Sequence, residues 1–283
     1  ERGWLAGTGS VEAWEAVVKA NDLLARAIAA EEPPNFEYPR SLLDQADSLL
    51  WLAQREDRSW CVPFALLART IERRAFMSIF DAWVTDADRA AMFDTADAYV
   101  EHAIASDRSD ATLWEQRGTL MHRRYLFAPP EPAAAEVLLD SAESNLRYAL
   151  ELEPLRARAA NTLSMVLFAR GEVEEAFDFA NQAYANDAYL REIDNIAYHL
   201  FELAFHLDDD EASRWCTEVE TRMPDTFATA NCQLKQVSWG ETNDMGGRTA
   251  LLIIENFGLA ETKAESDIMG PCLLPLAGPA VAA

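Results

Sequence analysis

Few residues in this sequence have the types and spacing that perform chemistry. His199 and His206 lie seven residues apart, so on a helix both rings would share one face and offer two ligands to a metal ion. The chain contains no P-loop, no HExxH motif and no GxSxG motif. We therefore expect no catalytic residue, no cofactor and no enzyme activity. A metal-binding or enzymatic protein that uses His199 and His206 is the alternative.

The four cysteines also bear on metal binding. None of them belongs to a CxxC pair, which argues against a zinc site, and their even number permits two disulfides without requiring them. The first residue is Glu1 rather than Met. That start fits a processed, exported protein and equally a trimmed fragment. We expect an extracytoplasmic or extracellular location, with a cytoplasmic protein as the alternative.

The charge of the chain limits its partners. Among its 283 residues, 48 are acidic and 24 are basic, which gives a net charge of −24. A field of that sign repels the phosphates of nucleic acids, so we expect no nucleic-acid partner. No apolar run approaches the ~20 residues that span a bilayer, so we expect no membrane span. Proteins or peptides remain as partners.

Helices are the elements that must position any site. Apolar residues return every three to four positions up to about residue 238, as in amphipathic helices. Ser10 precedes the first of them and is expected to cap it. The predicted helix pairs are 10–30/39–55, 60–80/87–106, 110–127/133–152, 156–170/172–186 and 190–206/209–222, followed by a single helix at 225–239.

One spacing of small residues recurs in five of these helices. Each copy has Ala, an apolar or small residue four positions later, a small or apolar residue three positions after that, and a final position five residues beyond. The copies begin at Ala46, Ala96, Ala142, Ala176 and Ala212. This register resembles the tetratricopeptide (TPR) repeat, a unit of ~34 residues. Trp114 and Gly118 stand where that family has an early Trp and a close-packing Gly, and Gly171 stands at the turn within a pair.

The resemblance covers about residues 10–238 and implies an all-α fold. We expect a right-handed α-solenoid of about five TPR-like helix pairs, with a capping helix and an irregular C-terminal tail. The corresponding domains are a solenoid over residues 1–239 and a tail or arm over residues 240–283.

The family also implies where a partner binds. The first helices of TPR pairs line a concave groove that commonly holds an extended peptide, and the matching positions can be carried over to this chain. In the fifth pair, the apolar pattern could shift the register by one residue. The predicted groove residues are Arg69, Arg73, His122, Arg123, Arg158, Asn161, Asn195, His199, Asn231 and Lys235.

Two properties of these residues suggest a ligand. Arginines gather there although the chain is acidic, so the groove would be a locally positive lane suited to carboxylates. The recurring Asn161, Asn195 and Asn231 could both donate to and accept from a peptide backbone. The alternative is that these polar residues only solvate a helix face.

These observations predict a non-enzymatic protein–protein interaction scaffold with a peptide-binding groove. From residue 240 onward the repeat stops, Gly and Pro become more frequent, and residues 249–257 have strand-like composition. We expect residues 249–283 to act as an arm that enters the groove of another copy and builds an oligomer or filament. The alternatives are a monomeric TPR adaptor that binds an unrelated peptide, and a tail that caps its own solenoid.

Overall fold

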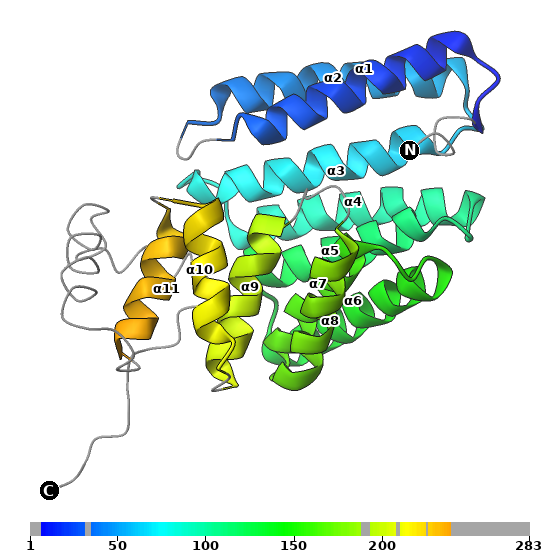
Figure 1. Cartoon of the computed structure of the whole chain (residues 1–283). Helices are drawn as coiled ribbons and strands as arrows, with labels where there is room; N and C mark the ends of the chain where they lie inside the picture. Colours follow the sequence, from blue (N-terminus) through cyan, green and yellow to red (C-terminus); the bar gives the residue numbers. More distant parts are fainter. Residues whose placement is uncertain (1–6, 32–34, 188–192, 208–209, 225, 239–283) are drawn as a thin grey trace, which may run out of the picture. The chain divides into compact units, whose positions relative to one another are not determined.

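The computed structural model describes residues 7–31, 35–187, 193–207, 210–224 and 226–238. Within these ranges the chain forms eleven α-helices and no β-strand, so the prediction of an all-α repeat fold is confirmed (Figure 1). The first six helices are α1 (Val11–Ala29), α2 (Glu37–Glu56), α3 (Val62–Met77), α4 (Asp86–Ser106), α5 (Ala111–Phe127) and α6 (Pro132–Leu152). The others are α7 (Ala157–Ala169), α8 (Val173–Asn186), α9 (Ile193–His206), α10 (Ala212–Arg222) and α11 (Phe227–Ser238).

The helix boundaries agree with the predicted pairs to within a few residues. Ser10 caps α1 as expected, because its hydroxyl accepts a hydrogen bond from the backbone N–H of Ala13 over 3.1 Å. No helix in the described ranges is both long enough and apolar enough to cross a membrane. The predicted tail, with its strand-like residues 249–257, lies outside the described residues.

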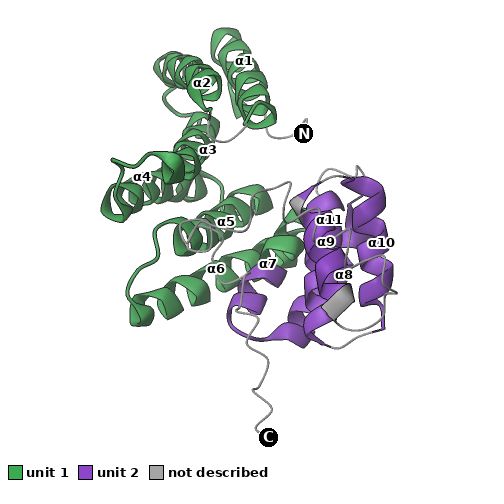
Figure 2. Ribbon diagram, turned by 90° about the vertical axis from the view of Figure 1, so that its left-hand side faces the viewer, with its two compact units in different colours: residues 1–162 green, residues 163–283 purple. Residues whose placement is uncertain are grey.

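The chain divides into two compact units, residues 1–162 and residues 163–283 (Figure 2). Unit 1 holds α1 to α6 and the part of α7 up to residue 162. Unit 2 holds the rest of α7 and α8 to α11.

Unit 1 is built from the helix pairs α1/α2, α3/α4 and α5/α6. The repeat alanines Ala46, Ala96 and Ala142 are fully buried, where their small side chains let neighbouring helices approach closely. Larger side chains such as Leu50, Phe93 and Leu146 fill the remaining space and are no more than 1% exposed. The recurring spacing in the sequence therefore records the packed face of each second helix.

Gly118 of α5 marks the tightest of these helix contacts. A Cβ atom added there would lie 2.5 Å from Cγ of Leu146 and 3.0 Å from the carbonyl oxygen of Ala142, both on α6. Glycine is therefore required by close packing, as the TPR register predicts.

We expect Gly118→Ala to lower the free energy of unfolding by about 1–3 kcal/mol, because α5 and α6 must separate to admit the methyl group. The higher helix propensity of Ala offsets about 1 kcal/mol of that loss at most. Urea unfolding measures the difference. Gly9→Ala is the matched control, since an added Cβ there meets no atom within 4 Å. Equal stability of the Gly118 variant and the wild type would contradict the packing role.

Unit 2 is also built from packed helix pairs. Gly171 has φ +81°, a left-handed conformation that suits glycine, and it forms the turn between α7 and α8. Ala176, Ala180 and Ala212 are fully buried, like their counterparts in unit 1.

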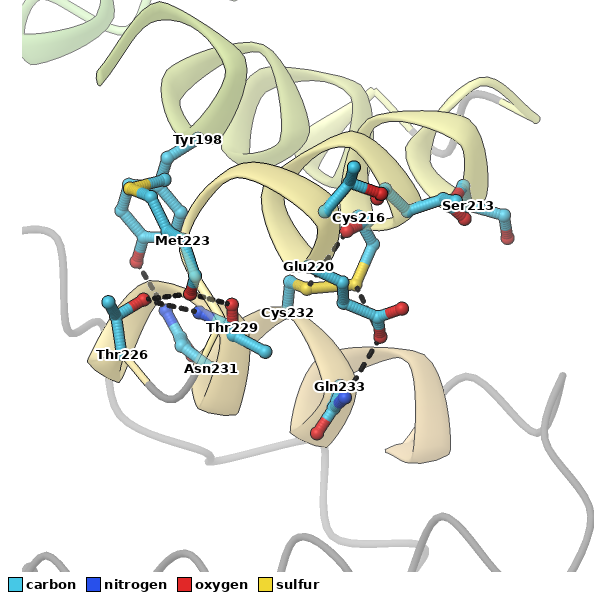
Figure 3. The surroundings of a disulfide bond; sticks show 12 residues. Tyr198, Ser213, Cys216, Glu220, Met223, Thr226, Thr229, Asn231, Cys232 and Gln233 are labelled. Atoms are coloured by element: carbon cyan, nitrogen blue, oxygen red, sulfur yellow. Dashed lines mark hydrogen bonds between the residues drawn. A yellow bond between two sulfur atoms is a disulfide. The ribbon is translucent and has the colours of Figure 1, made fainter. Parts of the chain in front are cut away.

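A disulfide between Cys216 of α10 and Cys232 of α11 links the last two helices (Figure 3). The sequence left the cysteine pairing open, and the structure assigns this one pair. Cys61 is a half-buried free thiol, and Cys272 lies outside the described residues.

Candidate binding site

The groove positions predicted on α3, α5 and α7 bring charged side chains together in unit 1. Arg73 contacts Glu31 with both ends of its guanidinium, and its Nε lies 2.8 Å from Oε1 of Glu31. Arg123 forms an ion pair with Glu72, and Arg156 reaches Oε2 of Glu115 with its Nε over 2.8 Å. We call this set the charged cluster. Its members are Glu31, Arg69, Glu72, Arg73, Glu115, Arg123, Arg156 and Arg158.

Helical spacing explains why the cluster forms. Arg69, Glu72 and Arg73 are three and four residues apart on α3 and therefore share one face. Glu115 and Arg123 lie eight residues apart on α5, again on one face of that helix. Arg156, which directly precedes α7, and Arg158, in the first turn of α7, are the last two arginines and lie beside Glu115. The sequence thus predicts the faces, but not which charges pair across them.

Glu72 is the buried anion of the cluster, with a residue exposure of 6%. Burial alone would raise its pKa, but Arg123, Arg73 and two further arginines outweigh burial and hold the pKa below its usual range. Glu72 is therefore ionised at neutral pH. Arg73 and Arg123, predicted to face a ligand, are instead largely committed to internal carboxylates.

Arg69 differs from the other arginines of the cluster. It is half-buried, yet within the described part of the chain no carboxylate lies within ion-pair distance of its guanidinium. Burial, and then the neighbouring Arg158, lower its pKa to about 10, so it still carries its proton at neutral pH. Arg158 itself is 3.8 Å from Glu115 and its side chain is 39% exposed. The cluster thus holds five guanidinium groups and three carboxylates. A fourth carboxylate, that of Glu153, lies 2.7 Å from Arg156, which leaves one positive charge.

Two other predicted residues of unit 1 are buried near the same helices. His122 of α5 and Asn161 of α7 are each 5% exposed. The side-chain oxygen of Asn161 has no hydrogen-bond partner among the described residues. A buried amide oxygen without a donor is costly, so this oxygen is an unsatisfied polar atom of unit 1.

In unit 2 the predicted residues are engaged internally. Asn231 donates from Nδ2 to the hydroxyl of Tyr198 over 2.6 Å (Figure 3). The same Nδ2 donates to Oε1 of Glu202 over 3.1 Å. Lys235 forms an ion pair with Glu202 and lies 5.0 Å from the ring centroid of Phe205. Glu202 thus contacts both Asn231 and Lys235, and it was not among the residues predicted from the sequence. Its position four residues after Tyr198 on α9 is the signal that could have indicated it.

His199 and Asn195 separate in the structure. His199 is 8% exposed, whereas Asn195 lies on the exposed side of α9 and does not align with the buried Asn161 and Asn231. Ser164 donates its hydroxyl proton to the carbonyl oxygen of Ala176, so it must accept from Nε2 of His199, 2.9 Å away. Burial lowers the pKa of His199 to about 4, so the ring is neutral at pH 7. The one-residue shift of register considered for the fifth pair explains why Asn195 lies on the exposed side of its helix.

The same geometry bears on the metal alternative. His199 and His206 both pack against the ring of Phe168, with centroid distances of 5.8 Å and 5.1 Å. Nε2 of His199 is already engaged in the hydrogen bond with the hydroxyl of Ser164. Among the described residues, the side chains whose donor atoms come close enough for a metal ion are Cys216, Glu220 and Cys232. The two cysteines of that group form the disulfide.

Solved structures that resemble this chain have the repeat fold described above. No protein-family model and no curated protein matches the chain. Among solved structures, PilF of Pseudomonas aeruginosa aligns with a TM-score of 0.61 at 13% identity, over 90% of this chain and 97% of that one. A thermophilic TPR protein of Thermus thermophilus aligns with a TM-score of 0.53 at 18% identity, over 77% of this chain and 97% of that one. This chain has the TPR fold.

The TPR register also explains Trp114 of α5. Its indole Nε1 donates to the carbonyl oxygen of Arg108 over 2.9 Å, and its ring packs edge-on against Tyr148 of α6 at 4.8 Å. The early Trp of the repeat therefore joins the loop before α5 to the second helix of its own pair. This residue and Gly118 have structural roles, which leaves the charged cluster as the candidate site in unit 1.

Proposed function

We propose that this TPR protein is a non-enzymatic interaction scaffold, and that the charged cluster of unit 1 binds an extended peptide that carries carboxylates. The observation that carries the proposal is Arg69, a half-buried cation with no carboxylate in ion-pair contact within the described ranges. A buried charge is stable only when paired, so an anionic ligand would supply the missing partner. The TPR fold supports a protein partner.

The residues of the cluster would have different roles. Arg73 and Arg123 are held by Glu31 and Glu72 and would fix the shape of the site. Arg69 and Arg158 would form charge-assisted hydrogen bonds with a ligand carboxylate. Of the positively charged groove residues expected from the sequence, only Arg69 and Arg158 would thus contact the ligand.

Binding of a fluorescent, glutamate-rich peptide, followed by anisotropy, tests this proposal. The double variant Arg69→Gln/Arg158→Gln should weaken binding by about tenfold or more, since each charge-assisted hydrogen bond contributes ~1.5–3 kcal/mol. Arg124→Gln is the matched control, because Arg124 lies on α5 but pairs with the exposed Asp94. Equal affinity of the double variant and the wild type would exclude this site.

Substitution of Arg73 and Arg123 is a poorer test. Exchanging Arg69, Arg73 and Arg123 for Glu would leave the fold intact only if all three charges were exposed. The structure places Arg73 and Arg123 in buried ion pairs, with side-chain exposures of 13% and 26% beside carboxylates of 9% and 8%. Reversing those charges would destabilise unit 1 and confuse loss of binding with loss of structure.

We propose further that residues 249–283 supply such a peptide to another copy, so that the protein assembles into an oligomer or filament. Glu255, Glu261, Glu265 and Asp267 provide the carboxylates in that segment. A chain truncated after residue 248 and the full-length Arg69→Gln/Arg158→Gln variant should both be monomeric by light scattering. Assembly of either one would favour the monomeric adaptor with an unrelated partner, or an arm that binds elsewhere.

An extracytoplasmic or extracellular location also remains our proposal. The disulfide between Cys216 and Cys232 supports it, because disulfides persist mainly in oxidising compartments. Alkylation of intact cells, followed by mass spectrometry, should find these two cysteines blocked. Recovery of both as free thiols would favour the cytoplasm.

A further inference from the structure

A second candidate site lies in unit 1 where the ends of α2 and α4 meet the start of α3. A pocket of about 410 Å³ is lined there by Trp51, Gln54, Arg55, Arg58, Phe64 and His102. Trp51 is 41% exposed and is among the large apolar side chains of the described chain that remain in solvent. The pocket therefore offers an apolar wall that the fold itself does not cover.

The aromatic wall is held in place by ring contacts. Phe64 lies 4.6 Å from His102 and 5.5 Å from Tyr99, measured between ring centroids. Trp51 lies 6.2 Å from both Phe64 and Tyr99, at interplanar angles of 90° and 79°. Edge-to-face contacts of this kind fix the rings relative to one another. A ligand side chain would therefore meet a preformed surface.

Two cations border this wall. Arg55 and Arg58 are exposed, and within the described part of the chain neither forms an ion pair. Asp57, which lies between them in sequence, is occupied elsewhere, because its carboxylate accepts hydrogen bonds from Thr8 over 2.5 Å and from Ser59 over 2.6 Å. In a chain with a net charge of −24, unpaired arginines beside exposed aromatic rings favour an anionic partner.

The pocket is separate from the charged cluster. Phe64 and Arg73 are nine residues apart on α3, which is two and a half helical turns at ~3.6 residues per turn, so they lie on opposite faces. Gln54 also lines the pocket and is fixed by donating Nε2 to the carbonyl oxygen of Trp60 over 2.5 Å. A ligand of the cluster would not reach this pocket on the other side of α3.

We propose that this pocket is a second docking site, which takes a peptide segment with one aromatic or large aliphatic side chain next to a carboxylate. The side chain would pack on Trp51 and Phe64, and the carboxylate would lie between Arg55 and Arg58. A volume of about 410 Å³ is at the small end of ligand pockets and suits one such anchor. A carboxylate fits better than a nucleotide phosphate, because the acidic chain repels the more highly charged phosphate more strongly.

Anisotropy with two labelled acidic peptides, one containing a single Phe and the other Ser in its place, tests the proposal on the full chain. The Phe peptide should bind at least severalfold more tightly. Arg55→Gln/Arg58→Gln and Trp51→Ala should each abolish that preference, while Arg69→Gln/Arg158→Gln should retain it. Both arginines are exposed, so the arginine variant is expected to fold even if Trp51→Ala does not.

Arg108→Gln is the matched control, since Arg108 is also exposed and ends the next repeat at the position that Arg58 occupies in its own. Equal affinity for the Phe and Ser peptides would overturn the proposal. So would a preference that survives in Arg55→Gln/Arg58→Gln. Stronger binding of a nucleoside monophosphate than of the Phe peptide, lost in the same variant, would assign the pocket to a nucleotide instead. Loss of the preference in Arg69→Gln/Arg158→Gln would assign it to the charged cluster.

Discussion

Replacing Glu72 with Gln is expected to lower the free energy of unfolding of unit 1 by about 3–5 kcal/mol. The two side chains have nearly the same shape, so the packing is preserved and the charge alone is lost. Arg123 and Arg73 would then be buried beside Arg69 and Arg158 without their shared carboxylate. Native-state hydrogen exchange of α3 and α5 measures the loss within this unit.

The same variant should lose part of the acid sensitivity of unit 1. Because the pKa of Glu72 is lower in the folded state than its ordinary 4.5, its contribution is fully present above the unfolded value and disappears as the pH falls through the folded value. The wild type should therefore lose stability below about pH 4.5, and Glu72→Gln should lose less. Glu101→Gln is the control, since Glu101 pairs with Arg117 but is 56% exposed, and we expect a change below about 1 kcal/mol. Equal effects of the two variants would contradict the role of Glu72.

Removing the disulfide is expected to have the second-largest effect. Cys216→Ala/Cys232→Ala should lower the free energy of unfolding of unit 2 by about 3 kcal/mol, the value that chain entropy gives for a loop of this length. The two cysteines are 16 residues apart, and both are fully buried between α10 and α11. Exchange protection of α11 should fall most, because the bond links this last described helix to α10.

Cys61→Ala is the matched control for that experiment. Cys61 is a free, half-buried thiol in unit 1, so its replacement should leave α10 and α11 unchanged. Treatment of the wild type with a reductant should reproduce the double variant. If α11 keeps its protection in both cases, helix packing rather than the disulfide holds it.

The fold could be predicted from the sequence because its repeat signal lies in small residues. Ala46, Ala96 and Ala142 each begin a copy of the recurring spacing, and all three are buried. Gly118 is required by a close contact with α6. A solenoid needs only such local rules, since each helix packs mainly on its neighbours. The helix boundaries could be predicted for the same reason, because they too depend on local sequence.

The candidate site could be predicted only in part. The register placed Arg69, Arg73 and Arg123 on helix faces that meet in the charged cluster, but it could not show that Glu31, two residues after α1, would neutralise Arg73 from 42 residues away. Pairing of charges depends on where side chains of different helices end, and helical periodicity does not contain that information. The aromatic pocket was missed for a similar reason, because Trp51, Phe64 and His102 come from three helices and form no motif.

The most direct test of the proposed function is a map of where an acidic peptide binds. Hydrogen–deuterium exchange of the full chain, with and without the glutamate-rich peptide, reports this for each helix. We expect protection on α3 around Arg69 and at the start of α7 around Arg158, and its loss in Arg69→Gln/Arg158→Gln. Protection confined to other helices, or unchanged in the double variant, would contradict the assignment of the charged cluster as the peptide site.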